Sequence, residues 1–144
     1  MATTLRIADS PDDLLKVMVV RGIVFLEEQQ VDWAGEFDQY ERASVHVLGD
    51  VDGQPAAAGR LRLLPDGWAK IERIAVRPRW RGQGLGRAMV IFLLEEARRR
   101  GVRRFRLHAQ TYLEDFYAGY GFVRRGDVFD ECGIPHLLMT REDG

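Results

Sequence analysis

Residues 71–86 read IERIAVRPRWRGQGLG, an apolar strand followed by a glycine-rich turn and the start of a helix. Apolar residues three and four apart continue the helix from about Gly84 to Arg100, and Gly101 ends it. A helix N-terminus offers unpaired backbone N–H groups and the positive end of a dipole, and glycines let an anion approach the backbone. The stretch therefore predicts a phosphate-binding turn. The alternative is a turn whose glycines serve tight packing alone.

Two common phosphate motifs do not fit this turn. A P-loop needs Lys and then Ser or Thr after its last glycine, whereas Arg87 and Ala88 follow Gly86. A dinucleotide fingerprint needs a third glycine three residues after the second, and neither glycine pair has one. Arginines nevertheless surround the turn and favour an anionic ligand, namely Arg77, Arg79, Arg81 and Arg87.

The motif that does fit is Arg-x-x-Gly-x-Gly, formed by Arg81, Gly84 and Gly86 after a strand that ends in IAV. Here the chain resembles the GNAT superfamily of N-acetyltransferases, whose members bind the pyrophosphate of acetyl-CoA at this turn. Residues 116–122, FYAGYGF, are similar to a second family segment. Three further segments, residues 24–29, 108–110 and 133–139, resemble the bacterial ElaA-like branch of this superfamily.

The order of predicted elements agrees with this resemblance. We expect an α/β (α+β) fold with the GNAT topology, a mixed and mostly antiparallel sheet of six to seven strands flanked by about four helices. One β-α-β crossover surrounds the long helix. The predicted strands are 5–8, 44–50, 55–64, 68–76, 104–109, 122–129 and 135–141. The predicted helices are 11–28, a short or irregular piece within 33–42, 84–100 and 113–120.

Composition limits the class of protein. The chain has 144 residues, 46% hydrophobic and 30% charged, which indicates one globular domain over residues 1–144. No run approaches the roughly 18 apolar residues of a membrane span, and nothing resembles an export signal. The single Cys132 agrees with a cytoplasmic protein that has no membrane partner.

The net charge of −1 conceals a segregated pattern. Residues 77–106 carry ten arginines against two glutamates, whereas the segments before and after are both acidic. Six acids and no base lie between Glu27 and Glu41. In the family this region frames the acceptor site, so these charges suggest a cationic acceptor, a small molecule or peptide with a primary amine. The alternative is a solvated acidic helix face.

The resemblance implies a set of cofactor residues. Backbone groups near Ile74 and Val76 would hold the pantetheine arm of acetyl-CoA, and N–H groups from Arg81 onward would hold its pyrophosphate. Tyr117 aligns with the family tyrosine that protonates the leaving thiolate, although it could be a core aromatic. The cofactor-binding candidates are Ile74, Ala75, Val76, Arg81, Gly82, Gln83, Gly84, Leu85, Gly86, Arg87, Phe116 and Tyr117.

Glu72 is the candidate general base. Period-2 geometry puts it on the strand face of Ile74 and Val76, where apolar company would raise the pKa of a carboxyl group. A structural partner for Arg60, Arg62 or Arg73 is the rival interpretation, and a water chain could replace the base altogether. Cys132 has no evident base beside it, which makes a covalent acetyl-cysteine route improbable.

The three histidines and one cysteine show no zinc-like spacing, so no metal is expected. His108 and His136, on late strands, suggest either a proton relay or a rigidifying hydrogen bond. A non-catalytic acyl-CoA sensor of the same fold is the alternative function. A nucleic-acid-binding module is less consistent, because the arginines are not interleaved with stacking aromatics. Homodimers are common in such folds, although no residue specifies one.

Overall fold

A computed structural model describes residues 2–144. It contains one seven-stranded sheet with the order β1-β2-β3-β4-β5-β7-β6. Only β4 and β5 run parallel, and the other neighbours are antiparallel. The strands are β1 (Thr3–Ile7), β2 (Val45–Val51), β3 (Gln54–Leu63), β4 (Ala69–Val76), β5 (Arg104–Gln110), β6 (Val123–Glu131) and β7 (Ile134–Glu142). The predicted fold class and the predicted crossover are both confirmed.

Four α-helices accompany the sheet, and their ends follow local sequence signals. The side chain of Ser10 caps α1 by accepting a hydrogen bond from the N–H of Asp13, with proline in the first turn. A π-helical segment, η1, continues α1 toward the expected end near residue 28. The helices are α1 (Pro11–Arg21), η1 (Gly22–Glu28), α2 (Trp33–Glu36), α3 (Leu85–Arg99) and α4 (Glu114–Ala118), with short 3-10 turns η2 (Pro78–Trp80) and η3 (Thr111–Leu113).

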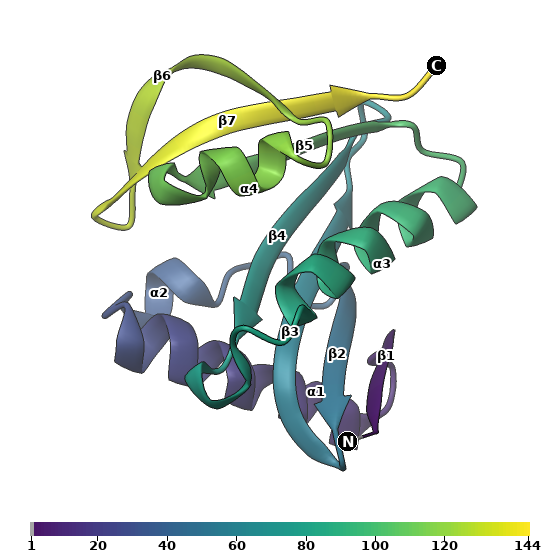
Figure 1. The fold of residues 1–144 in the computed structure, drawn as a ribbon, viewed down its shortest axis with the longest axis vertical. Helices are drawn as coiled ribbons and strands as arrows, with labels where there is room; N and C mark the ends of the chain where they lie inside the picture. The colour runs from purple at the N-terminus through teal and green to yellow at the C-terminus, as the bar shows by residue number, and fades with distance from the viewer. Residues whose placement is uncertain (1) are drawn as a thin grey trace.

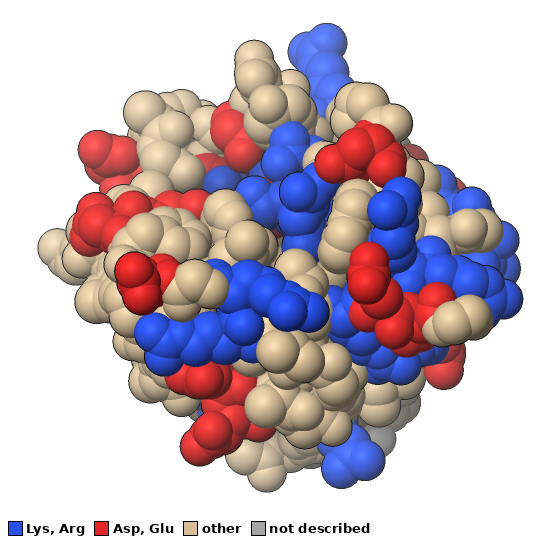
Figure 2. All heavy atoms as spheres, turned by 90° about the horizontal axis from the view of Figure 1, so that it is seen from above, with Lys and Arg blue, Asp and Glu red and all other residues tan. Residues whose placement is uncertain are grey.

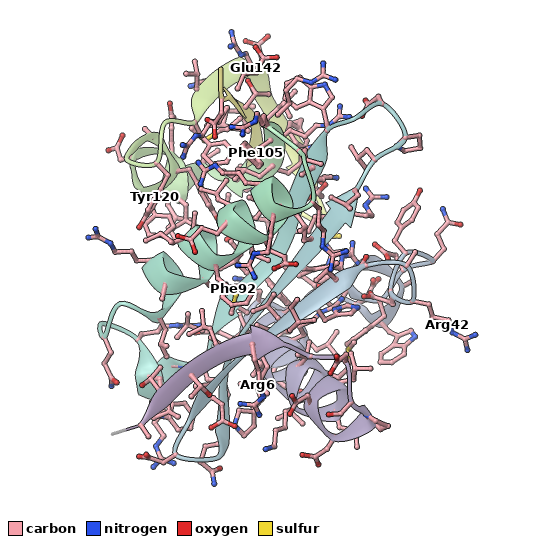
Figure 3. All side chains as sticks on the ribbon, turned by 90° about the vertical axis from the view of Figure 1, so that its right-hand side faces the viewer. Arg6, Arg42, Phe92, Phe105, Tyr120 and Glu142 are labelled. Carbon is pink, nitrogen blue, oxygen red and sulfur yellow. The ribbon has the colours of Figure 1, made fainter. Side chains whose placement is uncertain are left out.

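The helices cover both faces of the sheet (Figure 1). One core joins α3 and α4 to the sheet and includes Met89, Leu93 and Phe105. In Figure 3 the side chain of Phe105 lies inside the molecule close to α3, whereas that of Arg42 extends from the surface. A second core on the other face joins α1 and η1 to the sheet. The central strands are therefore buried on both sides.

The parallel pair at the centre of the sheet comes apart. Ladder pairs join β4 to β5 only from Ala69 to Ile71, opposite Phe105 to Leu107. Beyond Ile71 the two strands diverge, as Figure 1 shows for β4 and β5. The half of β4 that follows therefore has an edge without a strand partner, in the middle of an otherwise continuous sheet.

Candidate active site

A cavity of about 290 Å³ lies where β4 and β5 separate. Its lining comes from both faces of the sheet. Ile74, Leu113 and Tyr117 pack with the core that includes α3 and α4. Glu72 and His108 also line the cavity, and the residues that precede them in their strands, Ile71 and Leu107, belong to that core. Because strand side chains alternate, Glu72 and His108 point to the opposite face. This separation of β4 from β5, the splay, is thus lined from both faces of the sheet, and two reactants could approach it from opposite sides.

A β-bulge shapes the open edge of β4. In the ladder with β3, Arg60 faces Glu72 and Ala58 faces Ala75, so two β4 residues lie opposite Gly59. One of them, Arg73, has a φ of 55°. The extra residue reverses the alternation of side chains beyond it.

The bulge changes which residues share a face. Ile74 and Val76 pack with the core on the α3 side, as Ile71 does. Glu72 lies on the other face, where it meets Arg60 and Arg62. The prediction that Glu72 shares a face with Ile74 and Val76 is wrong, because strict period-2 alternation does not survive a bulge.

The glycine-rich turn leads from β4 into α3 with its N–H groups available. Gly82 and Gly84 have φ of 78° and 81°, a region that only glycine enters at little cost. Gly84 is the N-cap of α3, and no side chain caps it. The first-turn N–H groups of Leu85, Gly86 and Arg87 have no carbonyl within the helix to bind. The predicted phosphate-binding turn therefore has the local geometry that an anion needs.

The arginines around the turn are mostly engaged with the protein. The guanidinium of Arg81 donates to the carbonyl of Val76 at 2.8 Å and forms a two-pronged ion pair with Glu28 of η1. The Glu28 pair helps to raise the pKa of Arg81. Arg77 donates to the carbonyl of Pro55, and Arg79 lies over the ring of Trp80 at 4.7 Å. Arg77 and Arg81 thus hold the turn in place, which leaves the backbone N–H groups and the exposed side chain of Arg87 as the candidates for binding an anion.

Tyr117 of α4 lines the cavity and is 7% exposed. Its ring packs edge-on against Phe116 at 5.1 Å and Phe122 at 6.1 Å. Burial raises the pKa of the Tyr117 phenol, so the hydroxyl stays protonated throughout the neutral range. A Cβ added to Gly86 would lie 4.0 Å from the ring of Phe116, so α4 stands close to the first turn of α3.

Both carboxylate oxygens of Glu72 are committed to cations. Oε1 accepts hydrogen bonds from Arg60 and Arg62, each at 3.0 Å, and Oε2 lies 3.4 Å from the Nζ of Lys70. The side chain is 7% exposed. Of the arginines that sequence offered as its partners, Arg60 and Arg62 fill that role, while Arg73 pairs instead with Glu36 and Asp38. The geometry thus supports the structural interpretation of Glu72.

The acidic segment from Glu27 to Glu41 is largely neutralised by arginines. Arg21 and Arg60 are 1% and 0% exposed, and both bind Glu41. Four of the six acids form ion pairs with arginine, namely Glu28, Glu36, Asp38 and Glu41. The segment therefore offers much less free negative charge to an acceptor than its composition suggests.

His108, Glu131 and His136 gather at the other wall of the cavity. The Nδ1 of His108 lies 2.9 Å from Oε1 of Glu131, and the Nε2 of His136 lies 3.5 Å from Oε2. The hydrogen bond from His108 lowers the pKa of the Glu131 carboxyl. Sequence reasoning singled out both histidines but missed Glu131. This residue lies 23 positions after His108 and comes beside it only because β6 pairs with β7 and β7 pairs with β5.

Within residues 2–144, no three His, Cys, Asp or Glu side chains are placed so that they could hold a metal ion together, and no helix has the length and apolar character to cross a membrane. Gln110 of β5 donates from Nε2 to the Oε1 of Gln29 at 2.9 Å, so two of the family-like segments meet beside the cavity.

The chain is similar to a known protein family and to individual proteins over most of its length. Residues 22–142 match the model of an acetyltransferase (GNAT) domain. The chain is 38% identical to the Bacillus subtilis protein YyaT over 90% of this chain and 89% of that protein. It is 36% identical to the uncharacterized N-acetyltransferase YjcF of Bacillus subtilis, over 94% of this chain and 97% of that protein.

Solved structures share the whole fold. Escherichia coli ElaA superimposes with a TM-score of 0.87 at 25% identity, covering 98% of this chain and 100% of ElaA. A Lactobacillus plantarum protein gives 0.91 at 24% identity, with 99% of both chains covered. A GNAT family acetyltransferase of Elizabethkingia anophelis, solved with acetyl-CoA bound, gives 0.70 at 18% identity, with 97% of both chains covered. The low identity of the last two makes them evidence of fold alone.

Proposed function

The chain belongs to the GNAT acetyltransferase family and is an acyltransferase, and from this premise we propose that it moves an acetyl group from acetyl-CoA directly to a primary amine. The observation that carries the proposal is the cavity at the splay. It joins the open edge of β4 to Tyr117, and the uncapped N-terminus of α3 follows directly from the end of β4. The thioester and the phosphates of acetyl-CoA, together with an acceptor amine, could all bind in this region.

The cofactor would lie along β4, α3 and α4. Backbone groups of Ile74, Ala75 and Val76 have no strand partner on the β5 side, so they can bind the amides of the pantetheine arm. The N–H groups from Gly82 to Arg87 would receive the pyrophosphate, since that of Arg81 already donates to the carbonyl of Pro78 at 3.3 Å. Leu85 is buried beneath the turn and would support it, while Gln83 is exposed on it. Phe116 would pack beside the arm near Gly86.

Tyr117 is the proposed general acid. Its hydroxyl stays protonated because burial raises its pKa, and it lines the cavity where the thioester sulfur would lie. As the C–S bond breaks, the phenol would pass its proton to the thiolate of coenzyme A. Because Glu72 is held by three cations, we propose that it anchors Lys70 and Arg62 rather than taking the proton of the amine.

The test is release of free thiol from acetyl-CoA across a panel of primary amines. We expect turnover of at least one amine, and we expect Tyr117→Phe to lower kcat by roughly 10²- to 10⁴-fold, the usual contribution of a general acid. Binding of acetyl-CoA, measured by calorimetry, should be unchanged. Tyr120→Phe is the matched control, because Tyr120 also packs against Phe116 but does not line the cavity. Acetyl-CoA binding without turnover of any amine would instead support a sensor.

A further inference from the structure

The wall of the cavity formed by β5, β6 and β7 holds a cluster of rings around one carboxylate. The ring of Phe129 lies edge-on to His108 at 5.0 Å and stacks on His136 at 6.0 Å. Glu131 bridges the two imidazoles from the same hairpin. Nothing in the acid step at Tyr117 or in the binding of the cofactor uses this cluster.

Hydrogen-bond partners determine which nitrogen of each histidine is free. The Nδ1 of His136 lies 2.7 Å from the carbonyl oxygen of Ile134, which can only accept, so this nitrogen carries the proton. Its Nε2 is turned to Glu131, and the side chain is 8% exposed. Both nitrogens of His136 are therefore committed to protein groups.

His108 differs in one decisive respect. Its Nδ1 donates to the carboxylate of Glu131, which fixes the tautomer with a lone pair on Nε2. That Nε2 has no hydrogen-bond partner within residues 2–144 and is not among the buried unpartnered atoms. The side chain is 28% exposed and lines the cavity. An accessible lone pair on an imidazole backed by a carboxylate is the usual arrangement of a general base.

Resting on the proposed acetyl transfer to an amine, we propose that His108 is the general base that removes the proton of the acceptor amine. Glu131 is a positioning residue, which holds the tautomer of His108 and stabilises the imidazolium that forms. The two proton-transfer groups lie on opposite faces of the sheet. Tyr117 is on the face that α4 covers, and His108 is on the other face, from which the acceptor amine would approach. The thioester carbon would lie between them.

The proton steps balance with these two groups. An acceptor arriving as R–NH₃⁺ gives one proton to Nε2 of His108, and the imidazolium passes it to solvent. The neutral amine then attacks the thioester carbon and forms the C–N bond. The positively charged nitrogen gives its next proton to Nε2, while the C–S bond breaks and Tyr117 protonates the thiolate. The imidazolium returns its proton through water to the phenolate, so one proton is released per amide formed.

Other charged groups near His108 come from every neighbouring element. Lys70 and Glu72 of β4 line the same cavity and form an ion pair with each other. Arg106, on the same face of β5, is turned to Asp66. Glu131 of β6 and His136 of β7 complete the surroundings. Of these, Glu131 alone bonds directly to the His108 ring.

The decisive experiment is the pH dependence of kcat/KM for His108→Gln, with an alkylamine that the wild type acetylates. At pH 7 we expect a loss of about 100-fold or more. The loss should shrink as the pH approaches the pKa of the amine, since the amine then enters already neutral. A purely structural defect would lower the rate equally at every pH and would overturn the proposal, as would full activity. Equal thermal unfolding and acetyl-CoA binding establish that the variant is folded.

Two further variants test the pair. Glu131→Gln should move the acidic limb of the profile to lower pH, because it removes the charge that stabilises the imidazolium. His136→Gln should leave the limb in place. In the free wild-type protein, ring ¹⁵N shifts should show His108 with its proton on Nδ1. The opposite tautomer would refute the pairing of His108 with Glu131, whether or not an amine is turned over. Failure to turn over any amine would by itself refute only the proposed acetyl transfer.

Discussion

At the scale of single residues, the side chains of Arg77 and Arg81 beside the glycine-rich turn bind the protein itself. Arg81 looks like a phosphate ligand in sequence, since it opens the motif that defines the turn. In the structure its guanidinium joins the end of β4 to Glu28 of η1. We therefore propose that Arg81 would contribute to cofactor binding by holding the backbone N–H groups in position.

This role predicts the result of a double-mutant cycle. Arg81→Gln and Glu28→Gln should each raise the KM for acetyl-CoA by a similar factor, and the double variant should be no worse than either single one. Because both side chains are more than one-third exposed, the loss of stability should be small, about 1 kcal/mol or less. A much larger effect of Arg81→Gln alone would mean that its guanidinium contacts the phosphates directly.

Residue types in the turn were predictable from sequence, but their partners were not. Gly82 and Gly84 have the positive φ that favours glycine, which is a local requirement, and their part in binding a cofactor stays a prediction. The ion pairs of Glu72 were offered only as an alternative, because they depend on which β3 residue faces it across the sheet. Glu131 was missed for the same reason, since it reaches His108 only through the pairing of β6 with β7 and of β7 with β5.

At the scale of elements, the two ends of α3 have the same backbone requirement and different functions. Gly84 at the N-cap and Gly101 beyond the C-terminus have φ of 81° and 84°, and an added Cβ meets nothing within 4 Å at either position. Alanine at either site would thus cost strain without a clash, roughly 1–2 kcal/mol.

Gly84→Ala and Gly101→Ala should therefore lower the free energy of unfolding by similar amounts. Only Gly84→Ala should weaken acetyl-CoA binding, because it alone displaces the N–H groups that would face the pyrophosphate. Urea unfolding and calorimetric titration of both variants measure the two effects. Equal loss of affinity in the two variants would show that α3 matters for the cofactor only through overall stability.

The elements themselves were predicted with small errors in their bounds. The long helix was expected at 84–100 and is found at Leu85–Arg99. Its bounds were predictable because the apolar periodicity and the glycines at its two ends are local features of the sequence. The bulge in β4 was not predicted. It arises where Arg73 and Ile74 lie opposite Gly59, whose added Cβ would approach Met89 of α3 to 2.8 Å. Gly59 of β3 lies close under α3, and this packing between distant segments belongs to the tertiary structure, so the sequence of β4 alone does not reveal the bulge.

At the scale of the whole molecule, folding mixes charges that the sequence keeps apart. The arginine-rich stretch from 77 to 106 meets acids from distant segments, as in the pairs of Arg98 with Asp143 and Arg106 with Asp66. Figure 2 shows basic and acidic side chains side by side on the upper face of the molecule.

This mixing predicts weak electrostatic steering of the acceptor. Because four of the six acids between Glu27 and Glu41 are paired with arginine, raising the ionic strength should slow acetylation of a dicationic amine little more than that of a monocationic one. Steady-state rates at increasing salt measure the difference. A steep fall for the dication alone would restore the acidic segment as an attractor of cationic acceptors.

The same buried ion pairs predict how stability depends on pH. Burial acts to raise the pKa values of Asp38 and Glu41, but the hydrogen bonds and positive charges around them, above all those of Arg60 and Arg21, together outweigh it. Both pKa values are held at about 2, below their ordinary 3.8 and 4.5. Acids with lowered folded-state pKa values stabilise the fold above their unfolded values and lose this effect as the pH falls. Glu36 acts in the opposite direction, because burial raises the pKa of its carboxyl group.

The free energy of unfolding should therefore fall as the pH is lowered from about 4.5 to about 2, where both carboxylates take up protons. Asp38→Asn should be less stable at neutral pH and should show a shallower fall over this range. Urea unfolding at a series of pH values tests both statements. An equal slope in the variant would show that Asp38 contributes nothing to the acid sensitivity.

The sequence by itself determined the helices, the strands, the single crossover and the glycine turn, because propensity, capping and positive φ act within a few residues. Only the tertiary structure decided where β4 leaves β5, which face Glu72 occupies, that the acidic segment is neutralised, and that Glu131 backs His108. Each of these depends on strand register or on side chains that meet across 10 or more positions. The strength of a charge interaction or a hydrogen bond depends on the distance between the groups in space, and the spacing of residues along the chain does not give that distance.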